Sequence, residues 1–176
     1  MHIAESRLQA LVAQDIYGVS PIRHLDRLGV LNDQFVAAHG IWLDGGDLEI
    51  MAGHGARVAH VPGSNLRLGT GVAYARAMLD RGITVGIATD GANSADAINM
   101  FEAMRHASNM SRILGQPRAR WLGKREVLTM ATRNGARMIG LEDGGQVLLH
   151  LLLVDEAPLT RFFKDPRTTH SSFNFQ

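Results

Sequence analysis

Short, continuous apolar runs alternate along this chain with stretches whose apolar residues recur at helical spacing, and this alternation limits the folds it can adopt. Three runs, at residues 35–39, 57–61 and 83–89, are apolar nearly throughout instead of alternating with polar residues. Continuous hydrophobicity is typical of strands covered by helices, and strands that alternate with helices form parallel sheets. The sequence therefore predicts an α/β protein built on a parallel sheet.

Helix signals occupy the segments between these runs. Apolar residues within positions 8–16 repeat at i, i+3, i+4 and i+8, which is the period of one helix face. Ser20 before Pro21 is a typical helix start, and Asp44 with Asp47 three residues later indicates a second capped start. Further helices are expected at residues 44–53, 72–81, 96–114 and 127–140, with a loop at residues 116–123.

Two segments have less regular patterns. Residues 64–71 (SNLRLGTG) lack the Gly-Lys-Ser/Thr of a phosphate-binding loop, so we expect a βα loop that shapes a pocket. Residues 147–154 are apolar and predict one more strand, and the residues after them show no clear period. We therefore divide the chain into a β/α part at residues 1–145 and an apolar strand with an irregular tail at residues 146–176.

The charge and cysteine content exclude several classes of function. The chain has 18 Lys and Arg against 17 Asp and Glu, so it lacks the excess positive charge that binds nucleic acid or anionic membranes. It has no cysteine, so any metal must be held by histidine and carboxylate. The N-terminal residues lack a signal-peptide pattern and no apolar run is long enough to span a membrane, which favours a cytoplasmic protein.

Side chains able to support catalysis stand where the predicted strands end. His39, His60 and Asp90 each follow or close one apolar run, and His2 and Glu5 hold the equivalent position before the first helix. Because the carboxyl ends of parallel strands meet at one edge of a sheet, these side chains are expected to lie close together in one site. Histidine and aspartate are ligands that Zn(II) or Fe(II) accept, and a nearby glutamate is the usual proton carrier.

Each of these residues also has a structural interpretation. A single histidine at a strand end more often makes a hydrogen bond than binds a metal, Asp90 could form a turn, and His2 would normally be frayed beside the terminus. His60 lies between apolar neighbours and is interpreted as structural or as a support for the site. The other four residues stand at corresponding strand ends, which favours a shared functional site.

Several motifs resemble a known family. The segments HIAES, FVAAHGIWLD, VPGSNL, ATDGANS and EVLTMATRNGARMIGL, in this order, resemble the C-terminal half of the amidohydrolase superfamily. The likeness is greatest to its cytosine, guanine and S-adenosylhomocysteine deaminases and its triazine hydrolases, and it covers residues 1–141. It implies a distorted (β/α)8 barrel, of which residues 1–145 would form the end of the fifth unit, units six to eight and a C-terminal helix.

The resemblance also implies one divalent metal, most readily Zn(II), with Fe(II) as the alternative. In the family it is held by an HxH pair after the first strand, a histidine after the fifth and an aspartate after the eighth. His2 and Asp90 match the last two of these ligands. Glu5 matches the glutamate that carries protons, and His39 matches the histidine after the sixth strand that contacts hydroxide and substrate.

The implied reaction is hydrolytic deamination of an amino-substituted purine, pyrimidine or triazine. The metal lowers the pKa of a bound water and Asp90 accepts its proton. The hydroxide attacks a ring carbon, Glu5 protonates the ring nitrogen and then the leaving ammonia, and His39 stabilises the addition intermediate. Three residues match family loop positions near the substrate pocket: Ser64, Asn65 and Ser94.

The sequence departs from the family pattern in two respects. The HxH pair is absent, and 176 residues are fewer than the roughly 250 of a full barrel, so we interpret the chain as a fragment. We expect the chain alone to bind zinc weakly and to be inactive. An open sheet with uncovered apolar residues such as Val36, Val58 and Val85 also predicts a homo-oligomer.

The sequence is compatible with three functions. The leading one is a metal-dependent deaminase of a small heterocycle, with neither nucleic acid nor a membrane as partner. The second is a triazine-type chlorohydrolase or aminohydrolase that uses the same site on another leaving group. The third is a non-catalytic half-barrel that only folds or binds a partner.

Overall fold

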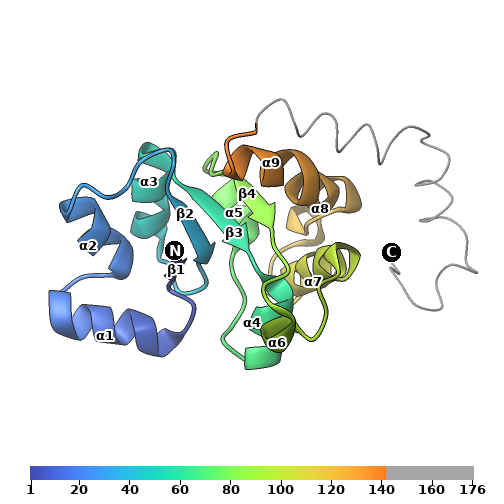
Figure 1. Ribbon diagram of the computed structural model, residues 1–176, viewed down its shortest axis with the longest axis horizontal. Helices are drawn as coiled ribbons and strands as arrows, with labels where there is room; N and C mark the ends of the chain where they lie inside the picture. Colours follow the sequence, from blue (N-terminus) through green and yellow to red (C-terminus); the bar gives the residue numbers. More distant parts are fainter. Residues whose placement is uncertain (142–176) are drawn as a thin grey trace, which may run out of the picture.

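The computed structural model of the chain describes residues 1–141 and contains a parallel sheet with the strand order β1-β2-β3-β4 (Figure 1). The strands are β1 (His2–Ile3), β2 (Val36–His39), β3 (Arg57–His60) and β4 (Val85–Ile87). Every neighbouring pair is parallel. The α/β class and the three strands predicted from apolar runs are confirmed.

The helices connect and extend these strands, and their starts follow the capping signals of the sequence. The Ser20 hydroxyl accepts the N–H of Arg23 at 3.2 Å, and Asp44 and Asp47 form a reciprocal capping box. The helices are α1 (Arg7–Tyr17), α2 (Pro21–Arg27), α3 (Gly45–Gly53), α4 (Pro62–Leu68), α5 (Ala75–Leu79), α6 (Ala92–Ala95), α7 (Met100–Arg112), the 3₁₀ turn η1 (Arg118–Arg120), α8 (Lys124–Thr129), the π-helical turn η2 (Met130–Asn134) and α9 (Gly135–Met138).

Some boundaries differ from the prediction. The expected loop at residues 64–71 contains most of α4, which starts with Pro62 and ends at Gly69 in the left-handed conformation. Its seven residues bury serine and asparagine, so they show no apolar helical period. Helices α5 and α7 are shorter than expected, and the last helix is interrupted by η2. The strand predicted at residues 147–154 and the tail lie outside the described residues.

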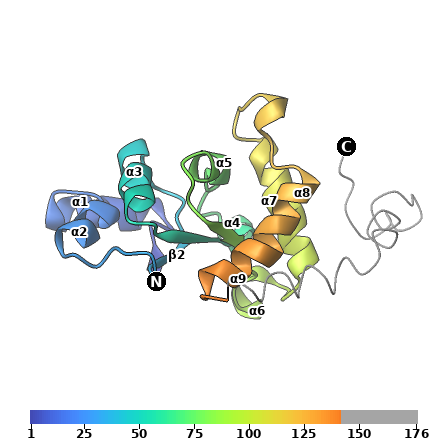
Figure 2. The same cartoon turned by 90° about the horizontal axis from the view of Figure 1, so that it is seen from above.

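The core lies between the sheet and the helices that connect its strands. Ala37, Val58 and Val85 are neighbours in register and fully buried, in one cluster with Met51 of α3 and Met78 of α5. Figure 2 shows α3 and α5 on one side of the sheet and α9 on the other. The expectation that Val58 and Val85 are uncovered was wrong, because they lie on the face that the connecting helices cover.

Helix α1 lies beyond the β1 edge of the sheet, next to α2 (Figure 1). Its apolar stripe faces outward, with Leu8, Leu11, Val12 and Ile16 between 44% and 69% exposed. The periodic pattern thus predicted the helix correctly but not the burial of this face. Among residues 1–141, no helix is both long enough and apolar enough to cross a membrane.

The last helical segment is fixed closely to β4. The Asn134 amide donates to the Val85 carbonyl at 2.9 Å, and the Arg57 guanidinium donates to the Arg137 carbonyl. Gly86 of β4 leaves the space that Met138 fills, since a Cβ there would lie 2.6 Å from the methionine methyl carbon. The glycine therefore permits close approach of helix and strand.

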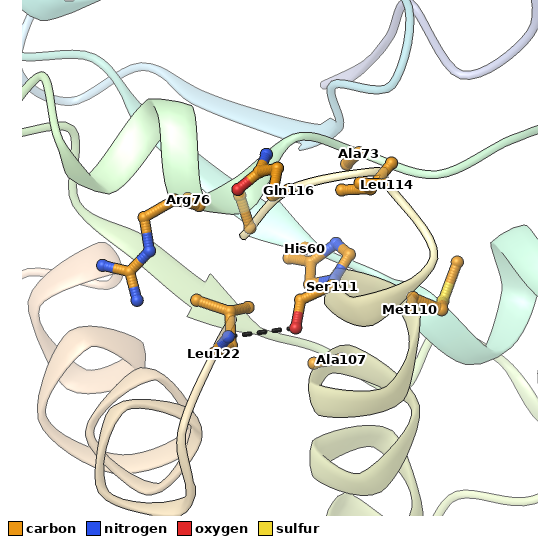
Figure 3. A pocket seen from close by; sticks show the side chains of 10 residues that line it. His60, Ala73, Arg76, Ala107, Met110, Ser111, Leu114, Gln116 and Leu122 are labelled. Atoms are coloured by element: carbon orange, nitrogen blue, oxygen red, sulfur yellow. Dashed lines mark hydrogen bonds between the residues drawn. The ribbon is translucent and has the colours of Figure 1, made fainter. Parts of the chain in front are cut away.

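His60 at the end of β3 is buried beneath α5 and α7, with Arg76 and Ser111 among its neighbours (Figure 3). The residue is 1% exposed. Among the residues that the structure describes, its Nδ1 has no hydrogen-bond partner and the space beside it has no room for a water molecule. Burial, and secondarily the charge of His39, lowers the pKa of His60 to about 4. This environment agrees with a structural role for the ring.

Gly86→Ala should lower the free energy of unfolding by about 1–3 kcal/mol, because the added methyl group displaces Met138 and approaches the Gly135 backbone at 3.3 Å. Urea denaturation measures the change. Gly53→Ala is the matched control, since its Cβ meets nothing within 4 Å. Adding Met138→Ala to Gly86→Ala should cost less than the sum of the single changes. A Gly86→Ala variant as stable as the parent would contradict this packing.

Acidification should destabilise the fold through His60. The pKa of His60 is about 4 in the folded chain and about 6.5 in the unfolded chain. Between these values the unfolded chain binds more protons, so the free energy of unfolding decreases as the pH is lowered. The expected contribution is a loss of about 2 kcal/mol from pH 7 to pH 5. Urea titrations across this range should show a smaller loss for His60→Asn. Equal slopes for parent and variant would remove His60 as the cause.

Candidate active site

Three residues at strand ends adopt a backbone conformation that favours glycine. Ala4 after β1, His39 at the end of β2 and Asp90 beyond β4 have φ values of 50°, 70° and 65°. A non-glycine residue in this region costs about 1–2 kcal/mol. The N–H of Gly40 donates to the Ala38 carbonyl at 3.1 Å, which closes a three-residue turn around His39. The turn ends the extended conformation of β2 at His39.

His39 is the centre of the site. Its ring is 1% exposed and its centroid lies 5.1 Å from that of His2. Its Nε2 lies 3.7 Å from Oε2 of Glu5, and its Nδ1 lies 2.9 Å from Oδ1 of Asn65. The three contacts come from β1, the turn after it, and helix α4 after β3, so the parallel sheet brings together residues that are far apart in sequence.

His2 is held in the sheet. The Met1 ammonium group donates to the Val36 carbonyl at 2.9 Å, and the Ala38 N–H donates to the Met1 carbonyl at 2.8 Å. His2 itself pairs in register with Ala38. The interpretation of His2 as a frayed residue was therefore wrong, because backbone hydrogen bonds to β2 fix the strand that carries it.

Glu5 lies in the turn between β1 and α1. Its N–H donates to the Gln9 side chain at 2.9 Å. The carbonyl of Ala4, just before it, accepts the N–H groups of both Ile41 and Trp42 at 3.0 and 2.9 Å. The Glu5 side chain is 28% exposed. Its backbone is thus fixed while its side chain remains partly exposed to solvent.

Asp90 stays ionised although it is half-buried. Burial would raise its pKa, but the Gly91 N–H at 2.8 Å, the Ser64 hydroxyl, and the charges of His39 and His2 together lower it. The Ser64 hydroxyl is near enough to affect this carboxylate, although it makes no hydrogen bond within residues 1–141. The charge of Asp90 therefore interacts with both His2 and His39.

The three residues expected near a substrate differ in their surroundings. Ser64 is fully buried, and in the described part of the chain its hydroxyl has no hydrogen-bond partner. Asn65 is 1% exposed and bonds His39, a role that the sequence did not indicate. Ser94 lies on α6, with its hydroxyl 3.5 Å from Oδ1 of Asn93, and within residues 1–141 no hydrogen bond joins it to His39.

These residues do not complete a metal site by themselves. A structural or catalytic zinc ion takes three or four protein ligands, and the chain offers His2 and Asp90 as candidates. Within the part of the chain that the structure describes, no three His, Asp or Glu side chains are arranged to hold a metal ion. A metal bound here would need further ligands from outside residues 1–141.

Two curated proteins with similar sequences are deaminases. The chain is 36% identical over 145 residues to the 5'-deoxyadenosine deaminase of Methanothermobacter thermautotrophicus, which covers 82% of this chain and 34% of that protein. It is 37% identical over 144 residues to the 5-methylthioadenosine/S-adenosylhomocysteine deaminase of Pyrococcus furiosus, with the same coverage. The chain thus spans about a third of the length of the curated relatives it matches.

Solved structures agree with this similarity. An adenosine deaminase from Xanthomonas campestris with bound zinc superposes with a TM-score of 0.77 at 32% identity, over 81% of this chain and 32% of that one. Atrazine chlorohydrolase from Arthrobacter aurescens TC1, complexed with zinc, gives a TM-score of 0.75 at 35% identity, over 82% and 32%. The sequence profile of the amidohydrolase family matches residues 1–148. The chain therefore belongs to the amidohydrolase family, and its four β/α units are part of the barrel that its relatives form.

Proposed function

We propose that this chain carries the proton-transfer half of a hydrolase active site that removes the amino group of an amino-substituted N-heterocycle. The observation that carries the proposal is the approach of Glu5 to His39 at 3.7 Å, with Asp90 in the same electrostatic environment. A carboxyl group, an imidazole and an ionised carboxylate are the groups that hydrolytic deamination requires for moving protons.

The proposed roles follow from burial and charge. Glu5 is open to a substrate and protonates the ring nitrogen and then the leaving ammonia. His39 is buried and fixed, so it can hydrogen-bond the attacking water or the addition intermediate without reorganising. Asp90 remains anionic, so it can orient that water or bind a cation. Ser64 and Ser94 are proposed to contact the substrate.

Zinc fits this proposal only in part. His2 and Asp90 are suitable as two of its ligands, and the structures of relatives hold zinc, with Fe(II) as the alternative ion. The remaining ligands would come from outside the described residues. When bound, such an ion supplies a more acidic water molecule.

An adenosine-type nucleoside is the proposed substrate class, because the related sequences and the zinc-bound structure are deaminases of adenosine derivatives. A triazine is the second candidate, since triazine hydrolase of Arthrobacter superposes almost as well, with a TM-score of 0.76. The two candidates differ in the leaving group, which is ammonia for the nucleoside and chloride for atrazine.

A chimera tests the proposal, because this chain spans only a third of its relatives. Residues 1–141 would replace the matching segment of the Methanothermobacter deaminase. We expect ammonia release from 5'-deoxyadenosine or 5'-methylthioadenosine, whereas chloride release from atrazine would support the second candidate. A folded chimera that binds zinc and releases neither product would favour the non-catalytic half-barrel.

Glu5→Gln in this chimera should retain the metal and lower turnover by about 100-fold or more, because a positioned general acid contributes about 10²–10⁴. Steady-state ammonia release and metal analysis measure the two effects. Glu49→Gln, which removes the same charge from the exposed side of α3, is the matched control and should leave turnover unchanged. Near-normal turnover of Glu5→Gln would exclude Glu5 from the mechanism.

His39→Asn should bind metal nearly as well as the parent chimera while losing most of its activity, because His39 is placed as a contact to water and not as a ligand. Metal content after dialysis and the rate of ammonia release separate the two roles. If the variant purified without metal, His39 would be a ligand instead.

A further inference from the structure

Asn65 contacts the side of His39 that faces away from Glu5. Its Oδ1 lies 2.9 Å from Nδ1 of His39, and both side chains are only 1% exposed. The other ring nitrogen, Nε2, is the one that approaches Glu5 at 3.7 Å. The two nitrogens therefore have different partners, one a buried amide and the other a carboxyl group open to solvent.

The backbone holds Asn65 in place. It lies within α4, where its N–H donates to the Val61 carbonyl and its own carbonyl accepts the Thr70 N–H, both at 3.1 Å. Its amide Nδ2 is buried and has no hydrogen-bond partner among residues 1–141. Within residues 1–141, the contact with His39 is therefore the one hydrogen bond that this side chain makes.

A carbonyl oxygen can only accept a hydrogen bond, so the observed contact requires a proton on Nδ1. We propose that Asn65 is a positioning residue that holds neutral His39 as the Nδ1–H tautomer, which leaves Nε2 unprotonated toward Glu5 and the reacting water. In this state Nε2 accepts a hydrogen bond from water and does not compete with Glu5 as a donor. The catalytic part of this role rests on the proposed function, whereas the tautomer does not.

The opposite orientation of the Asn65 amide would favour the other tautomer of His39. If the amide were turned, Nδ2 would donate to Nδ1 and the proton would lie on Nε2. The buried Oδ1 would then lack a partner in place of Nδ2. Determining which ring nitrogen carries the proton therefore decides the proposal directly.

Nitrogen-15 NMR of the 176-residue chain with labelled histidine rings makes this measurement. Spectra at about pH 9, well above the ordinary histidine pKa of about 6.5, report neutral rings. Subtracting the spectrum of His39→Gln identifies the His39 signals. We expect a protonated Nδ1 and an unprotonated Nε2. A proton mainly on Nε2 would overturn the proposal.

Two substitutions test whether Asn65 is the cause. Asn65→Asp keeps the acceptor and should keep the Nδ1–H tautomer, whereas Asn65→Leu should shift the tautomer ratio toward Nε2–H by about tenfold. Ser64→Ala is the matched control from the same buried turn and should leave the ratio unchanged. An unchanged ratio in Asn65→Leu, or loss of the Nδ1–H form in Asn65→Asp, would assign the tautomer to another group.

The chimera tests the catalytic consequence. Asn65→Leu should lower kcat by about 10–100-fold with little change in KM, and Asn65→Asp should restore part of the loss. A merely structural role would affect both variants alike and would not change the tautomer. An inactive parent chimera would contradict the proposed function, while the NMR measurement on the chain would still decide the role of Asn65.

Discussion

Parallel pairing of the strands is the constraint on which the candidate site depends. It aligns His2 with Ala38 and Ile3 with His39, so the carboxyl ends of β1 and β2 meet at one edge of the sheet. The same register continues through β3 and β4. The helices that connect the strands form the hydrophobic core against one face of the sheet. The polar side chains at the strand ends are therefore not needed for the packing of that core.

Turns with a strained backbone follow the strands at this edge and carry the polar side chains of the candidate site. His39 ends β2 with a positive φ, and its ring lies close to His2 and Glu5. Asp90 has the same conformation beyond β4. Such backbone strain persists only where surrounding contacts fix it, and here hydrogen bonds from Gly40 and Gly91 do so.

Much of the fold could be predicted because its signals are local. A cap such as Ser20 before Pro21, or the box formed by Asp44 and Asp47, depends on residues within one turn. Helix α4 could not be predicted, since a short helix that buries polar residues lacks an apolar period. The exposure of Leu8 and Leu11 on α1 is likewise a matter of which elements pack nearby, and periodicity carries no information about that.

The sequence by itself determined the residue types of the site and the strand ends that carry them, because His2, Glu5, His39 and Asp90 stand in recognisable motifs. Only the tertiary structure decided how they interact. The contact of Asn65 with His39 spans 26 positions and joins helix α4 to the end of β2, so neither local propensity nor motif spacing specifies it. The distances between these side chains, their burial and the pKa of Asp90 depend on how β1 to β4 are arranged in the folded chain. They cannot be derived from the order of the residues alone.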